Sequence, residues 1–136
     1  MAFLAPLQYA LDLSDAESGE KKLLLSVEVS RHGERAPHFI YDFALRPEEN
    51  FTVPYNLTET GASSHYANGQ GLRNFFDRQN GGAGFLSQEY DEKEIYVQTS
   101  YKQRTIDSAR SQLDGLYGKP LAWPDIDPKF KLNIVP

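Results

Sequence analysis

The sequence predicts an α/β fold, an α/β/α sandwich around a mostly parallel sheet. Residues 23–30 are nearly continuous in apolar character, which is typical of a strand that is covered on both faces. Strand and helix patterns then alternate along the chain, in the order strand, helix, strand, helix, strand. Such alternation favours right-handed crossovers with helices packed against the sheet.

The first half of the chain contains the most irregular stretches. Residues 1–22 are expected to form a polar N-terminal extension, with 12–22 as a solvated connection. Residues 58–78 carry apolar side chains near every third or fourth position and predict a helix. Its glycines each cost about 1 kcal/mol relative to alanine, which indicates that they serve close backbone packing. Residues 81–84 end this helix as a glycine-rich loop.

The second half predicts a strand, a capped helix and a further strand. Residues 94–98 have strand character, and Ser100 stands in capping-box relation to Gln103. The helix that starts there is expected to stop at Gly118. Residues 131–135 are expected to begin a third strand.

Composition limits the possible functions. The net charge of −5 argues against nucleic acid as a general partner, but a small phosphate ester is compatible with it because a cleft can oppose the global charge. There is no cysteine, so disulfides and thiolate chemistry are excluded. His32, His38 and His65 lack the spacing of a helical metal pair, and neither a metal nor another cofactor is expected. No apolar run is long enough to cross a bilayer.

The residues that follow the first predicted strand predict a phosphate site. Residues 31–37 read Arg-His-Gly-Glu-Arg-Ala-Pro, which places His32 between Arg31 and Arg35. Arg104 follows the second predicted strand, at the start of the capped helix. If the two strands are neighbours, all four side chains face one crevice at the carboxyl edge of the sheet. Guanidinium groups bind phosphate oxygens in pairs, and a neutral nitrogen of His32 can attack phosphorus.

The remaining candidate residues are expected to be structural. His38 and His65 are interpreted as structural histidines. Arg73 and Arg78 of the first helix and Arg110 of the second are interpreted as surface charges.

The motif Arg-His-Gly-x-Arg-x-Pro at 31–37 resembles the signature of the histidine acid phosphatases, the family of acid phosphatases and phytases. Residues 57–75 resemble the family's helix of type Leu-Thr-x-x-Gly…Gly-x-x-Leu-Arg. Residues 99–109 resemble the block that supplies a further phosphate-binding arginine, except that Tyr101 replaces a common aspartate. The resemblance covers residues 23 to about 118.

The resemblance implies a phosphoglycerate-mutase-like sandwich that is only partly present, with 23–136 as the N-terminal part of the domain. It implies hydrolysis of small phosphate monoesters through a phosphohistidine on His32, with Arg31, Arg35 and Arg104 binding the phosphoryl group. The family's second half supplies a histidine and an acid that protonates the leaving group, and no histidine follows His65 here. Family members are commonly more than twice as long as this chain.

Three hypotheses about function remain open at this stage. The chain is the N-terminal half of a phosphomonoesterase and lacks the proton donor. Alternatively, it is a non-catalytic phosphate-binding fragment or pseudoenzyme. A phosphoglycerate-mutase-like transferase is disfavoured, because that branch usually lacks the second arginine and the proline of the motif.

The sequence leaves the compartment and the oligomeric state open. Two glycosylation sequons begin at Asn50 and Asn56, and together with the family they indicate a secretory or lysosomal location. The N-terminus, however, has no cationic region and is a poor signal peptide.

Overall fold

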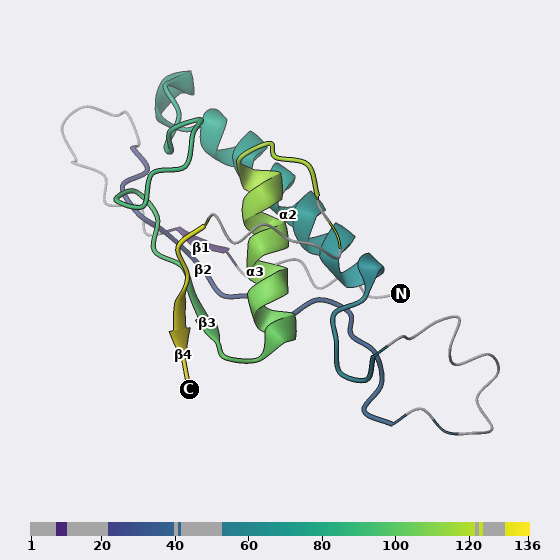
Figure 1. Cartoon of the computed structure of the whole chain (residues 1–136). Helices are drawn as coiled ribbons and strands as arrows, with labels where there is room; N and C mark the ends of the chain where they lie inside the picture. The colour runs from purple at the N-terminus through teal and green to yellow at the C-terminus, as the bar shows by residue number, and fades with distance from the viewer. Residues whose placement is uncertain (1–7, 11–21, 40, 42–52, 122, 124–129) are drawn as a thin grey trace.

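The computed structural model describes residues 8–10, 22–39, 41, 53–121, 123 and 130–136. Figure 1 shows two long helices beside short strands. In chain order the elements are β1 (Gln8–Ala10), β2 (Ser26–Glu28), α2 (Glu59–Asp77), the 3₁₀ turn η1 (Asn80–Gly82), β3 (Gln98–Ser100), α3 (Gln103–Leu116) and β4 (Asn133–Val135).

Helices α2 and α3 cross in close contact because glycines lie at their interface. A Cβ at Gly69 of α2 would overlap the backbone carbonyl of Gln112 on α3. A Cβ at Gly115 of α3 would overlap the carbonyl of Tyr66 on α2. The two backbones therefore approach more closely than any larger residue permits, which is the packing role expected for the glycines of the first helix.

The hydrophobic core lies between the C-terminal halves of the two helices. Phe130 packs there, ahead of β4, and Tyr90 contacts both Tyr117 and Phe130 edge-on. Its buried members are Leu72, Phe76, Leu113, Leu116, Tyr117 and Phe130.

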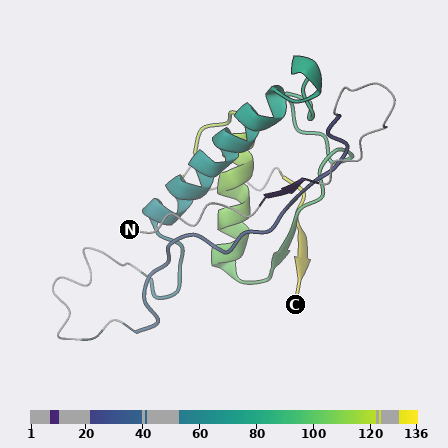
Figure 2. The ribbon, with the colours of Figure 1, turned by 180° about the vertical axis from the view of Figure 1, so that it is seen from behind.

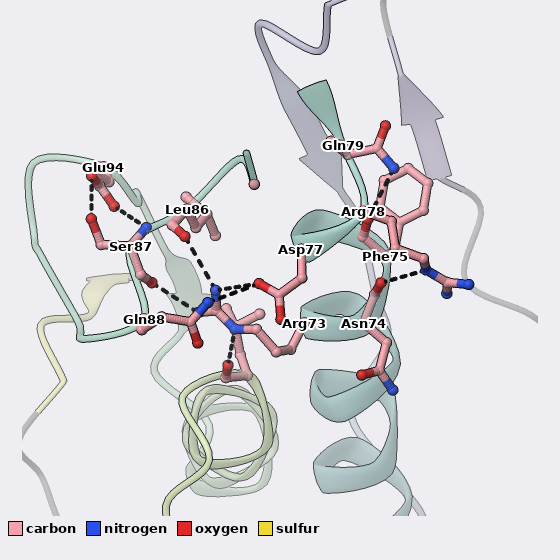
Figure 3. Close-up of polar contacts among 12 residues, drawn as sticks. Arg73, Asn74, Phe75, Asp77, Arg78, Gln79, Leu86, Ser87, Gln88 and Glu94 are labelled. Carbon is pink, nitrogen blue, oxygen red and sulfur yellow. Dashed lines mark hydrogen bonds and ion pairs between the residues drawn. The ribbon is translucent and has the colours of Figure 1, made fainter. Parts of the chain in front are cut away.

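Arg73 of α2 is a structural residue, so its interpretation as a surface charge is wrong. Its side chain is only 11% exposed and forms an ion pair with Asp77 at 3.4 Å. Nε donates to the carbonyl of Leu116 at 2.7 Å, and the terminal nitrogens donate to Leu86 at 3.3 Å and Ser87 at 3.0 Å (Figure 3). One guanidinium thus satisfies carbonyls at the end of α3 and in the loop that follows η1. Arg78, in contrast, is exposed, as predicted, whereas Arg110 of α3 is half-buried and its Nε is buried.

The strands form two separate pairs among the described residues. β1 pairs with β2 in antiparallel orientation, and β3 pairs with β4 in parallel orientation. The α/β class is confirmed, with helices and a small parallel sheet. The strands predicted at 23–30 and 94–98 are not neighbours in the described structure, because β2 and β3 belong to different sheets.

The first strand is also shorter and more exposed than predicted. Of residues 23–30, only Ser26–Glu28 are strand. Val27 is 49% exposed and Val29 is 78% exposed, so burial on both faces is wrong for this segment. Figure 2 shows the reason: the chain through β2 crosses the helices on one side only, and β1 is its partner in the described structure.

The helices agree with the sequence more closely than the strands do. The helix predicted for 58–78 is α2, which begins after Thr58. The predicted strand at 131–135 is β4. The strand predicted for 94–98 is β3, shifted to Gln98–Ser100 by its register against β4. At Glu94 the carboxylate instead accepts from the backbone and hydroxyl of Ser87 (Figure 3).

The two ends of α3 differ from each other in how well they were predicted. At the N-terminus the expected capping box is absent, because Ser100 bonds Thr105 and the Gln103 amide donates to Asp107. At the C-terminus Gly118 has a φ of 60°. The amide of Lys119 then bonds the carbonyl of Asp114, and the amide of Gly118 bonds that of Gly115. This Schellman motif ends α3 where the sequence predicted it.

Two further predictions concern the N-terminal half. β1 lies inside the predicted extension 1–22, and the division at residue 22 stays a prediction. Asn56 is exposed, whereas Asn50 lies outside the described residues. In the part of the chain that the structure describes, neither helix has the length and apolar character that a membrane crossing requires.

Candidate active site

The segment 31–37 passes the N-terminal ends of both α2 and α3 (Figures 1 and 2). We call residues 31–37 the site loop. Its second half pairs with the residues that lead into α2: the Ala36 amide donates to the Asn56 carbonyl at 2.8 Å, and the Thr58 amide donates to the Glu34 carbonyl at 2.9 Å. This short antiparallel pairing fixes the loop against the start of α2.

The start of α2 holds the loop by both a cap and a close contact. Thr58 is the N-cap and accepts from the Gly61 amide at 3.1 Å, while its hydroxyl donates to the Glu34 carboxylate at 2.8 Å. Gly33 and Gly61 lie backbone to backbone, and a Cβ built on Gly33 would be 2.6 Å from the Gly61 carbonyl oxygen. The backbone of Gly33 thus passes directly against the first turn of α2.

Ser108 of α3 connects the loop to the helix that carries Arg104. Its hydroxyl accepts from the Gly33 amide at 3.0 Å. The same hydroxyl donates to the Arg104 carbonyl one turn earlier at 2.7 Å. A single buried side chain therefore brings the backbones of Gly33 and Arg104 together, although β2 and β3 are not neighbours.

The ring of His32 is half-buried and has a defined tautomer. Nδ1 lies 2.8 Å from the carbonyl oxygen of Gly33. A carbonyl oxygen only accepts, so Nδ1 carries the proton and Nε2 of the neutral ring holds the lone pair. Among the described residues, Nε2 has no hydrogen-bond partner.

The three arginines are placed differently from one another. Arg31 has an exposed side chain. Arg35 donates to the Ala36 carbonyl at 2.8 Å and lies 6.0 Å from the ring centre of Tyr55. Arg104 is half-buried in the first turn of α3, and its Nε is buried with no hydrogen-bond partner in the described structure. The contacts thus join the backbones of the loop and α3, but they do not join the four side chains.

The first turn of α3 offers backbone donors. Lys102 is the N-cap and makes no side-chain cap. The amides of Thr105 and Ile106 bond the Lys102 carbonyl, so among the described contacts the amides of Gln103 and Arg104 are the ones that stay available to an anion. Nearby, burial raises the pKa of the Asp107 carboxyl, with the Gln103 amide and Arg110 acting in the opposite direction.

Sequence reasoning missed the residues that hold the loop. Ser108 and Gln112 lie on the face of α3 that meets the loop and α2, and Thr58 caps α2. Ser108 belongs to the block 99–109 that was singled out, but no spacing rule assigns its hydroxyl to Gly33. His65 is buried, as expected for a structural histidine, and His38 stacks on Tyr55 at 4.3 Å.

The chain is similar in sequence to several acid phosphatases. The chain is 37% identical over 90 residues to a lysosomal acid phosphatase of Xenopus laevis, a match covering 65% of this chain and 19% of that protein. It is 32% identical over 105 residues to a Bos taurus lysosomal acid phosphatase, a match that covers 76% of this chain and 22% of that protein. It is 31% identical over 120 residues to a Mus musculus prostatic acid phosphatase, a match that covers 86% of this chain and 28% of that protein.

This chain thus matches about a fifth to a quarter of the length of these relatives. The sequence profile of the family described as "Histidine phosphatase superfamily (branch 2)" matches residues 22–135. That match includes the site loop, both helices and β4. The chain belongs to branch 2 of the histidine phosphatase superfamily.

Proposed function

We propose that this chain binds phosphate monoesters between the site loop and the head of α3, and that His32 accepts the phosphoryl group. The observation that carries the proposal is the Ser108 hydroxyl, which bonds both the Gly33 amide at 3.0 Å and the Arg104 carbonyl at 2.7 Å. Because of it, the residue after His32 and the arginine of α3 share one hydrogen-bond partner. The family of acid phosphatases to which the relatives belong supports the same chemistry.

His32 is suited to the covalent step by its tautomer. Since Nδ1 donates to the Gly33 carbonyl, Nε2 can form a bond to phosphorus while the ester P–O bond breaks. The electron pair of that bond goes to the leaving oxygen, which must take up a proton. Water then attacks phosphorus, the P–N bond breaks and inorganic phosphate leaves.

The arginines and the helix start provide the charge for this step. Arg31, Arg35 and Arg104 are proposed to bind the phosphoryl oxygens, because guanidinium forks pair with such oxygens and keep their charge. The unpaired Nε of Arg104 and the uncapped amides of α3 support an anion at this place. Donors arranged before the reaction stabilise the charge that develops in the transition state.

Leaving-group protonation is the step for which these 136 residues offer no histidine–acid pair, since no histidine follows His65. Loss of a general acid lowers the rate by about 10²- to 10⁴-fold. We therefore propose that the 136-residue chain binds phosphate esters and has little or no steady turnover. A non-catalytic phosphate-binding role is the second candidate, and the same missing pair favours it.

Calorimetric titration with vanadate, combined with covalent labelling, tests the proposal. Arg35→Ala is expected to weaken vanadate binding about tenfold or more, by loss of a charge-assisted contact. Arg78→Ala is the matched control, because that arginine is exposed and bonds the Asn74 carbonyl of its own helix. Unchanged affinity in Arg35→Ala, or an equal loss in Arg78→Ala, contradicts the site.

Labelling separates the two candidate functions. After incubation with p-nitrophenyl phosphate and quenching, an acid-labile phosphoryl label is expected on the wild-type chain and not on His32→Ala. Vanadate binding without a label indicates the non-catalytic role. Steady turnover that disappears in His32→Ala shows that the chain needs no additional proton donor, which contradicts the proposed loss of turnover.

A further inference from the structure

His65 lies at the centre of a chain of hydrogen bonds that ends on the site loop. Its Nε2 is 3.1 Å from the carbonyl oxygen of Arg31, the first residue of the loop. Its Nδ1 is 2.9 Å from Oε1 of Gln112 on α3. Gln112 Nε2 in turn donates to the Glu28 carboxylate on β2 at 2.7 Å. The chain thus joins β2, α3, α2 and the loop.

The donors and acceptors in this chain require one extra proton. Carbonyl and carboxylate oxygens only accept, so Gln112 must donate to Glu28 and turn its oxygen toward His65. Both ring nitrogens of His65 then face acceptors, and both must carry hydrogen. The ring is a donor on both sides only as an imidazolium cation.

Turning the Gln112 amide round does not remove the requirement. Amide orientations are assigned from such networks, so the reversed one must be considered. Its nitrogen would donate to Nδ1 of a neutral His65, but its oxygen would face the Glu28 carboxylate. That contact is a hydrogen bond only if Glu28 is protonated. Without the extra proton, every arrangement gives up one of the three hydrogen bonds.

The groups around His65 bring one charge of opposite sign to this proton, the carboxylate of Glu28. His65 is 5% exposed, and the other carboxylate oxygen of Glu28 is buried with no partner in the described part of the chain. On α2, the residues one turn away are uncharged: Gly61, Ala62, Asn68 and Gly69. Gln112 is the residue of α3 that bonds the His65 ring. Arg31 contacts the ring through its backbone carbonyl, and the Arg31 side chain is exposed. Glu28 is therefore the counter-charge, acting through Gln112.

We infer that His65 is a positioning residue of the site loop and that the Glu28–Gln112–His65 chain holds the loop fully only while it carries this proton. With the proton bound, all three hydrogen bonds hold the loop carbonyl at Arg31 in place, and when the proton leaves, one of the three is given up. That His65 serves the phosphate site rests on the proposed function; the proton itself does not.

Glu28→Gln provides a sharp test, because an amide at this place removes the need for the proton. The introduced amide would donate to the Gln112 oxygen, the Gln112 nitrogen to Nδ1 of His65, and Nε2 of a neutral ring to the Arg31 carbonyl. All three bonds then persist without an extra proton. Glu34→Gln is the control, since it removes an exposed carboxylate of the same loop that bonds Thr58 and lies outside the chain.

The first readout is the nitrogen spectrum of the His65 ring between pH 5 and pH 8. At pH 5 we expect either both ring nitrogens protonated or the Glu28 carboxyl protonated by its ¹³C shift. In Glu28→Gln the ring should lose its second proton at a pH lower by about one unit or more, a tenfold change in proton affinity, whereas Glu34→Gln should match the wild type. A neutral ring beside an ionised Glu28 at pH 5, or equal titrations in wild type and Glu28→Gln, overturns the inference.

The second readout connects the proton to the site. The ratio of the vanadate Kd of the wild type to that of Glu28→Gln should rise about two- to tenfold between pH 5 and pH 7.5, since one hydrogen bond is lost only in the wild type. Vanadate speciation cancels in this ratio. A constant ratio overturns the positioning role. If no variant binds vanadate at any pH, the proposed function fails, and with it the role in the site, while the ring spectrum still decides the proton.

Discussion

Replacing Ser108 with alanine removes the one side chain that bonds both the site loop and α3. The variant leaves the Gly33 amide without an acceptor, which costs about 1–3 kcal/mol for a buried donor. Alanine is the better helix former and returns about 0.5 kcal/mol. The Arg104 carbonyl is that of a helical residue, so losing the hydroxyl there costs little. The net loss is about 0.5–2.5 kcal/mol, which corresponds to a roughly 2- to 70-fold weaker vanadate affinity when all of it falls on the loop conformation that binds the anion.

Ser111 provides a matched control on the same helix. Its hydroxyl donates to the Asp107 carbonyl at 2.8 Å, the same contact that Ser108 makes one turn earlier, and its side chain is fully buried. It has no bond to the loop among the described contacts. Titration calorimetry on both variants should show the affinity loss in Ser108→Ala alone, with Ser111→Ala within about twofold of the wild type. Equal losses in the two variants, or none in either, would refute the bridging role of Ser108.

Two further substitution pairs test the packing. Gly61→Ala places a Cβ against the backbone of the site loop and should destabilise the chain by about 1–3 kcal/mol, whereas Gly71→Ala meets open space and should gain up to about 1 kcal/mol in urea unfolding. Similar effects at both positions would contradict the close contact. Arg73→Met should destabilise the chain by about 2–4 kcal/mol, because the carbonyls that Arg73 bonds lose a charged donor. Arg78→Ala should change the stability by no more than about 0.5 kcal/mol. A melting curve for Arg73→Met that matches that of Arg78→Ala would rule out the structural role of Arg73.

The strands show which features the sequence pattern could not predict. The apolar run at 23–30 predicts burial on both faces, but a run of apolar residues does not say which partners cover it. In the structure β2 pairs with β1 from the N-terminal region, and Val29 remains largely exposed. The same limit explains the shift of the second strand, whose register is set by β4, about 35 residues away in sequence.

The site shows a similar division. The spacing in 31–37 and the arginine after the second strand were readable from the sequence. The sequence brought Arg104 to the loop only on the condition that the two strands are neighbours, and in the described structure they are not. The loop and Arg104 come together through Ser108, whose role depends on the angle at which α3 passes the loop.

By itself the sequence determined the α/β class, the two helices, the end of α3 at Gly118 and the motif around His32. These features depend on neighbours within a few residues, so periodicity, turn chemistry and motif spacing report them directly. The tertiary structure alone decided strand pairing, the glycine contacts and the proton-requiring chain from Glu28 to His65. These contacts join groups that lie far apart in sequence and come together only when the helices pack. A local sequence pattern therefore cannot predict them.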